Sequence, residues 1–112
     1  MQVPMNGSVR QNENEIRWMK NYFTNLGISL VLPDPTLPLN ERLQQIKKSK
    51  FYFYYNKDSN IDEKTMFELG FALGWGLQIL CLKPMEGNCV EGTGQCRLLQ
   101  EVFPRCQAPI PG

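Results

Sequence analysis

The sequence contains no histidine. Histidine is the usual base in Ser-His and Cys-His catalysis and the commonest zinc ligand, so its absence excludes those catalytic classes and the most familiar zinc sites. Any acid-base chemistry must therefore use carboxylates or, less often, lysine, tyrosine or cysteine.

A strong net charge and a long apolar run are also missing. Lysine and arginine number 12 against 11 acidic residues, which leaves a net charge of +1 and no basic field to hold a long nucleic acid. No stretch approaches the roughly 20 apolar residues of a membrane helix, and the first residues lack the charged and apolar regions of a signal peptide. We expect a cytoplasmic protein that contacts no membrane and binds a small molecule.

Closely spaced cysteines are absent as well. The four cysteines are Cys81, Cys89, Cys96 and Cys106, and their spacings fit neither a tight metal-binding knuckle nor a CxxC redox pair. We expect reduced thiols, while a disulfide among the last three stays open if the chain is exported.

Strand and helix signals alternate along the chain. The sequence predicts strands over 2–5, 28–32, 51–55 and 77–82, and helices over 16–26, 39–48 and from 62 or 63 to 76. A chain of 112 residues has room for one core, so we expect a single domain over 1–112. Within it, 86–112 forms a partly irregular tail with a short helix over 97–103.

This alternation predicts an α/β fold, a small three-layer parallel sheet with Rossmann-like or flavodoxin-like topology. In such sheets ligands bind beyond the carboxyl ends of the strands. The loops that matter are therefore 5–10, 32–38, 55–62 and 83–88.

One carboxylate lies within the apolar run 66–75. Helical periodicity places Glu68 on one face with Thr65, Ala72 and Trp75, so it is not expected to be fully solvated. A buried carboxylate needs a partner or a raised pKa, and such groups in clefts are candidate catalytic residues. The alternative is that Glu68 only benefits from the positive end of the helix dipole.

Asp62 lies six residues earlier, in the loop that leads into the same helix. It is equally suited to cap the helix and to act as a second catalytic carboxylate. Two carboxylates without histidine suit cleavage of a glycosidic bond, one as nucleophile and one assisting proton transfer. That chemistry requires no metal ion and no other cofactor.

Three glycines weaken the helix that carries Glu68. Gly70, Gly74 and Gly76 each cost up to about 1 kcal/mol relative to alanine, so close approach of another element is expected. Packing within the monomer and a dimer seam both explain them.

Two motifs resemble a known family. Residues 62–72, Asp-Glu-Lys-Thr-Met-Phe-Glu-Leu-Gly-Phe-Ala, are followed by Leu-Cys-Leu-Lys-Pro at 80–84, and Asn-Gly-Ser-Val-Arg at 6–10 ends the first expected strand. Together they resemble the nucleoside 2-deoxyribosyltransferases and their relatives, the 2′-deoxynucleoside 5′-phosphate N-hydrolases.

The resemblance implies roles for individual residues. Glu68 would be the nucleophile at the anomeric carbon, and Asp62 would position the sugar or aid proton transfer. The implied substrate-binding residues are Asn6, Gly7, Ser8, Arg10, Thr65 and Asn88. Among these, Ser8, Arg10 and backbone N–H groups from Gly7 onward would hold a 5′-phosphate or hydroxyl. The resemblance also implies a homodimer or higher homo-oligomer, in which Asn88, Thr93 or Gln95 of a neighbouring subunit would supply an amide or hydroxyl to the site.

The chain also departs from the family pattern. Glu41-Arg42 replaces an aspartate commonly found in the helix before the third strand, and Lys50 stands where a second aspartate usually precedes that strand. Glu63-Lys64 replaces a small pair in the loop. An aromatic residue often seen near the end of the first strand is absent.

Three functional hypotheses follow. The first is an enzyme that cleaves or transfers at the N-glycosidic bond of a (deoxy)nucleoside or nucleoside 5′-monophosphate. The second is a non-catalytic nucleotide-binding module of the same fold. The third is an interaction domain that uses the aromatic strand 51–55 or the tail, although those aromatics equally suit a sheet core.

Overall fold

The computed structural model describes residues 1–58, 61–84 and 94–104. The strands are β1 (Gln2–Gly7), β2 (Ser29–Val31), β3 (Phe51–Tyr55), β4 (Gln78–Cys81) and β5 (Cys96–Leu98). The helices are α1 (Glu13–Asn25), α2 (Leu39–Lys47), α3 (Glu63–Trp75) and α4 (Leu99–Val102). All strand pairs are parallel, and the order is β2-β1-β3-β4-β5. The predicted α/β fold class is thus confirmed.

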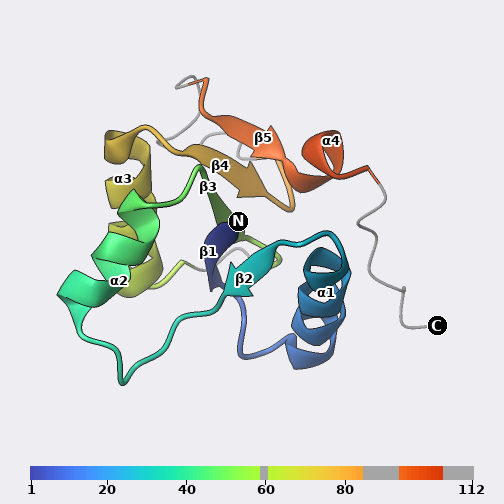
Figure 1. The fold of residues 1–112 in the computed structure, drawn as a ribbon, viewed down its shortest axis with the longest axis horizontal. Coiled ribbons are helices and arrows are strands. Elements are labelled where there is room, and N and C mark those ends of the chain that lie inside the picture. Colours follow the sequence, from blue (N-terminus) through green and yellow to red (C-terminus); the bar gives the residue numbers. More distant parts are fainter. Residues whose placement is uncertain (59–60, 85–93, 105–112) are drawn as a thin grey trace.

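Helices cover both faces of the sheet (Figure 1). Because successive strand residues point to opposite faces, β3 contributes to two cores. Phe53 and Tyr55 pack with α1 and α4, whereas Tyr52 and Tyr54 pack with α2 and α3. These four side chains are at most 5% exposed, so they belong to the sheet core and offer no contact surface, while Phe51 is partly buried.

The structure adds one strand that the sequence does not indicate. Cys96–Leu98 pairs with the edge of β4, and the helix expected over 97–103 is limited to Leu99–Val102. Three residues are too few to show a strand periodicity, and the unpaired edge of β4 provides the reason for pairing. The strand also covers Cys81, a buried thiol, whereas Cys89 and Cys106 lie outside the described residues.

The chain order reverses between β1 and β3, in the middle of the sheet. From their carboxyl ends, β1 leads to α1 on one face and β3 leads to α3 on the other. A crevice for a ligand is expected at such a switch point. Within the described ranges no helix is long and apolar enough to cross a membrane.

Gly7 brings the two central strands unusually close. Its φ is +132°, and a Cβ at this position would lie 2.2 Å from the Tyr55 carbonyl oxygen. Ser8 N donates to the same oxygen at 3.0 Å. Only glycine fits this position, because both the conformation and the contact exclude a side chain.

We predict opposite effects of alanine at two glycines. Gly7→Ala should lower the free energy of unfolding by about 3 kcal/mol or more, because it adds strain and a backbone clash. In the monomer, Gly70→Ala should raise it by about 0.5–1 kcal/mol, since this helical position meets no atom of the same chain within 4 Å. Urea denaturation measures both, and equal stability of the two variants would contradict the packing described.

Candidate active site

Asp62 is the N-cap of α3. Its Oδ1 accepts a hydrogen bond from Thr65 N at 2.8 Å. The Thr65 hydroxyl and backbone N–H beside Asp62 hold the pKa of that carboxyl below its usual value. Asp62 is therefore ionised at neutral pH, and its Oδ2 is not used by the cap.

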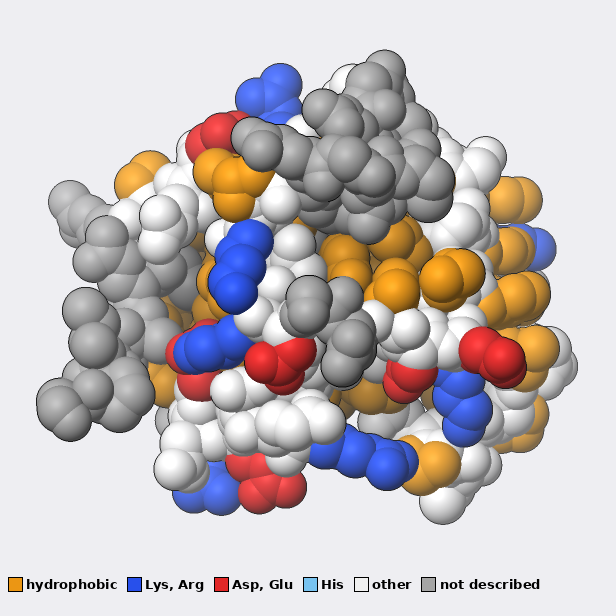
Figure 2. Space-filling view, turned by 180° about the vertical axis from the view of Figure 1, so that it is seen from behind, with side chains coloured by type: hydrophobic (Ala, Val, Ile, Leu, Met, Phe, Trp, Pro, Cys, Tyr) orange, Lys and Arg blue, Asp and Glu red, His pale blue; other side chains and the backbone are white. Residues whose placement is uncertain are grey.

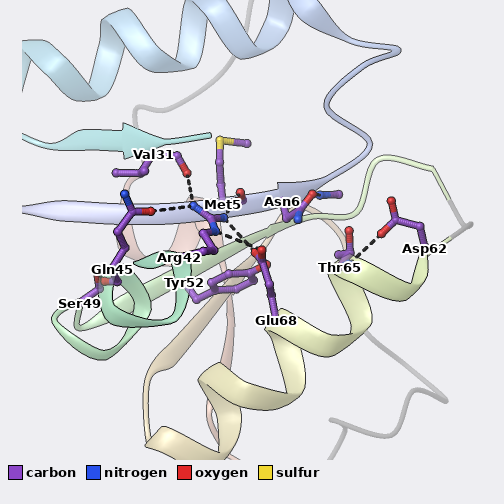
Figure 3. A network of polar contacts seen from close by, with 11 residues as sticks. Met5, Asn6, Val31, Arg42, Gln45, Ser49, Tyr52, Asp62, Thr65 and Glu68 are labelled. Atoms are coloured by element: carbon purple, nitrogen blue, oxygen red, sulfur yellow. Dashed lines mark hydrogen bonds and ion pairs between the residues drawn. The ribbon is translucent and has the colours of Figure 1, made fainter. Parts of the chain in front are cut away.

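Glu68 lies about one turn beyond Thr65 on α3 and is 7% exposed. It forms a bidentate ion pair with Arg42 of α2: Nη2 lies 2.9 Å from Oε1, and Nε lies 3.1 Å from Oε2. The Tyr52 hydroxyl donates to Oε1 at 3.0 Å (Figure 3). The buried carboxylate thus has a partner, as its position in an apolar helix requires.

The remaining N–H donors of Arg42 bond to two strand carbonyls and to one side chain of α2. Nη2 also donates to Met5 O at 2.8 Å, and Nη1 donates to Val31 O at 3.2 Å and to Gln45 Oε1 at 3.4 Å. All five guanidinium N–H groups are then engaged. Arg42 ties β1, β2 and α3 to α2 and has no donor left for a ligand.

Tyr52 is fully buried on β3. Burial, followed by the negative charge of Glu68, raises the pKa of the Tyr52 phenol well above its usual value. The phenol therefore stays protonated and acts as a donor. Glu68 is the acceptor in all three contacts.

Asn6 and Thr65 lie beside this pair at the carboxyl edge of the sheet (Figure 3). Both side chains are buried, and Asn6 Oδ1 accepts from Gly7 N at 2.9 Å. Thr65 Oγ1 finds no hydrogen-bond partner of good geometry in the part of the chain that the structure describes. Asn6, Asp62, Thr65 and Glu68 are therefore brought together.

The loop that the sequence predicts to bind a phosphate does not present free backbone N–H groups. The N–H groups of Gly7, Ser8 and Val9 all donate within the protein, to Asn6 Oδ1, Tyr55 O and Gly7 O. Ser8 is buried, and its Oγ accepts from Asp58 N at 3.1 Å. The backbone donors from Gly7 to Val9 are thus already used, and the side chains of Ser8 and Arg10 remain as the candidates.

Arg10 is exposed and lines a hollow at the start of α1. The hollow is formed by residues 10–15, Trp18 and Lys57. Within it, burial raises the pKa of Glu15, but hydrogen bonds from Lys57 and Tyr55 outweigh this and leave that pKa below its usual value. The hollow lies on the α1 side of the sheet, whereas Glu68 lies on the α3 side. Asn88 is outside the described residues.

Sequence reasoning missed Arg42 and Tyr52 as parts of the site. A signal for Arg42 exists, because Leu39, Arg42, Leu43 and Ile46 share the apolar stripe of one helix. An arginine on such a stripe needs a buried counter-charge. Tyr52 gives no comparable signal, since it lies in an all-aromatic strand.

Comparisons with known proteins show a structural similarity but no sequence match. No protein-family model and no curated protein matches the sequence. Among solved structures, the chain is similar to a CMP N-glycosidase, BcmB, from Clostridium botulinum, with a TM-score of 0.68 and 13% sequence identity. The match covers 88% of this chain and 87% of that chain. The chain therefore has the fold of a protein described as a nucleotide N-glycosidase.

We predict that removing one partner of the Arg42–Glu68 pair destabilises the protein far more than replacing both partners. Arg42→Met leaves a buried carboxylate without its cation and should lower the free energy of unfolding by about 3–5 kcal/mol. The double variant Arg42→Met/Glu68→Met should recover most of that loss, because no unpaired charge remains. Glu41→Gln, on an exposed neighbour in α2, is the control and should change stability by less than about 0.5 kcal/mol. Chemical denaturation of the four proteins checks this, and a double variant no more stable than Arg42→Met would contradict it.

Proposed function

We propose that the protein cleaves or transfers at the N-glycosidic bond of a (deoxy)nucleoside or nucleoside 5′-monophosphate, with Glu68 as nucleophile. The observation that carries the proposal is the carboxylate of Glu68, which Arg42 and Tyr52 hold in one orientation at the carboxyl edge of the central strands. The fold shared with a CMP N-glycosidase and the motif around Glu68 support it.

The proposed reaction has two steps. Glu68 attacks C1′ of the sugar, and the C1′–N bond breaks with its electron pair going to the base, which takes up a proton. Water, or a second base, then attacks C1′ and releases Glu68. The reaction requires neither a metal ion nor a cofactor.

Asp62 has two proposed roles, and its charge state favours one of them. Since its lowered pKa leaves it ionised, it suits acceptance of a hydrogen bond from a sugar hydroxyl or of a proton from the attacking water. Donation of a proton to the base is less suited to it. Ser8 and Arg10 are proposed to hold the 5′ end of the substrate, with Asn6 and Thr65 beside the sugar. Asn88 remains proposed as a contribution from a second subunit.

A non-catalytic nucleotide-binding module is the second candidate. The observation that favours it is the bidentate ion pair with Arg42, because it makes Glu68 a structural counter-ion as well as a candidate nucleophile. A carboxylate has about four acceptor positions, and three are occupied. Ligand-dependent thermal stabilisation without turnover would identify this second function.

We also propose that the protein forms a homodimer through the outer face of α3. Met66, Phe67 and Trp75 are each more than half exposed there, and Figure 2 shows hydrophobic side chains along the side where α2 and α3 lie. A Cβ at Gly70 or Gly74 would meet no atom within 4 Å, so packing within the monomer does not explain these glycines. Gly76, by contrast, has φ +90° and caps the helix.

A second copy suits this face better than an unrelated partner. Glu63 lies in the first turn of α3, and Lys47 Nζ lies 4.7 Å from the centre of the Trp75 ring near the other end. Two α3 helices packed antiparallel about a two-fold axis would place these opposite charges near each other and oppose their helix dipoles. The glycines would allow the close approach.

Base release tests the proposed function. Purified protein is incubated with deoxynucleosides, deoxynucleotides and ribonucleotides including CMP, with and without an acceptor base, and free and exchanged bases are quantified by chromatography. We expect turnover of at least one substrate, and a loss of at least about a thousandfold in Glu68→Gln, since the nucleophile is removed.

Glu41→Gln is the matched control and should keep full activity, because Glu41 is exposed on α2 and takes no part in the contacts of Glu68. Thermal melting of both variants separates loss of chemistry from loss of fold. Full activity in folded Glu68→Gln, or no turnover of any substrate by the wild type, would refute the assignment.

Sedimentation equilibrium tests the dimer. Phe67→Glu should convert dimer to monomer, because it places a charge in the apolar face of α3. Leu26→Glu is the control, since Leu26 is equally exposed, at 53%, but follows α1. A wild-type monomer at micromolar concentrations, or equal effects of both variants, would contradict the proposed interface.

A further inference from the structure

The two oxygens of Glu68 are not equivalent. Oε1 accepts from both Arg42 Nη2 and the Tyr52 hydroxyl, whereas Oε2 accepts only from Arg42 Nε among the described residues. Each carboxylate oxygen has two lone pairs. Oε1 is therefore saturated, and Oε2 keeps one open acceptor position.

The donors that create this difference are held rigidly. Arg42 is fixed by the carbonyl oxygens of Met5 and Val31 on two strands, and Tyr52 is fully buried within the sheet. Rotation of the carboxylate would break three hydrogen bonds at once. The two oxygens are therefore not expected to exchange.

We propose that Tyr52 is a positioning residue that makes Oε2 of Glu68 the attacking atom and makes Glu68 a good leaving group in the second step. This inference rests on the proposed function. Tyr52 acts through Glu68 and does not itself touch the substrate.

The bond changes explain the second part of the inference. In the first step a lone pair of Oε2 forms the C1′–Oε2 bond, and the C1′–N bond breaks with its pair going to the base, which is protonated by solvent. In the second step water forms a bond to C1′, the C1′–Oε2 pair returns to Oε2, and the proton of water passes to Asp62 or to solvent. Negative charge reappears on the carboxylate in this second step.

The Tyr52 hydroxyl stabilises that returning charge more than it stabilises the neutral ester, because a hydrogen bond to a charged acceptor is the stronger one. Without it the carboxylate is a stronger base and a poorer leaving group. The glycosyl-enzyme should then accumulate. A purely structural role of Tyr52 would produce no such accumulation.

Tyr52→Phe tests the inference with a substrate that the wild type turns over, in the absence of acceptor base. Rapid quenching should show a burst of up to one base per subunit, followed by a steady rate about ten- to a hundredfold below that of the wild type. Intact-protein mass spectrometry of the quenched sample should show a sugar or sugar-phosphate adduct on a larger fraction of the protein than in the wild type.

Tyr22→Phe is the control for loss of a phenol, since Tyr22 lies on α1, on the opposite face of the sheet. It should behave as the wild type. A Tyr52→Phe enzyme that is folded by thermal melting and shows wild-type kinetics, or a slower rate without burst or adduct, would overturn the inference alone. A wild type without any turnover would instead overturn the proposed function, and the inference with it.

Discussion

The buried ion pair between Arg42 and Glu68 fixes how two helices of this fold meet the sheet, and neither partner can be changed alone without leaving a buried charge. Transfer of two charges from water into the interior costs several kcal/mol per ion, and a pair of this kind persists only when its remaining donors and acceptors are also satisfied. Arg42 meets that condition, because two strand carbonyls, a glutamine and a carboxylate accept all of its N–H groups. The pair thereby holds α2 and α3 side by side and fixes both helices to the carboxyl edge of β1 and β2.

The same carboxylate is the proposed nucleophile, so stability and chemistry are linked in one side chain. A glycosyl ester on Glu68 would remove the negative charge and leave the Arg42 guanidinium buried without its counter-ion. The covalent state is then disfavoured relative to the free carboxylate by the very contacts that stabilise the fold. Such a site favours rapid release of the sugar over storage of an intermediate.

Much of the fold can be predicted from the sequence, because apolar runs such as 51–55 and amphipathic stretches such as 39–48 each show one clear periodicity. The strand Cys96–Leu98 cannot, since three residues depend on a neighbouring edge rather than on their own pattern. Glu68 is identifiable as a carboxylate in an apolar helix. Its pairing with Arg42, 26 residues away, depends on two helices meeting on one face of the sheet, which no local pattern contains. The engagement of the Ser8 N–H group likewise follows from a contact with the neighbouring strand, whereas the N–H groups of Gly7 and Val9 bond within the loop.

The complete engagement of Arg42 also constrains how this chain can change over evolutionary time. Replacement of either member of the pair first produces a molecule with an unpaired buried charge, and only a second replacement restores a satisfied interior. Positions 42 and 68 are thus expected to be inherited together, and a lineage with an acidic residue at position 42 is separated from this one by an unstable intermediate sequence.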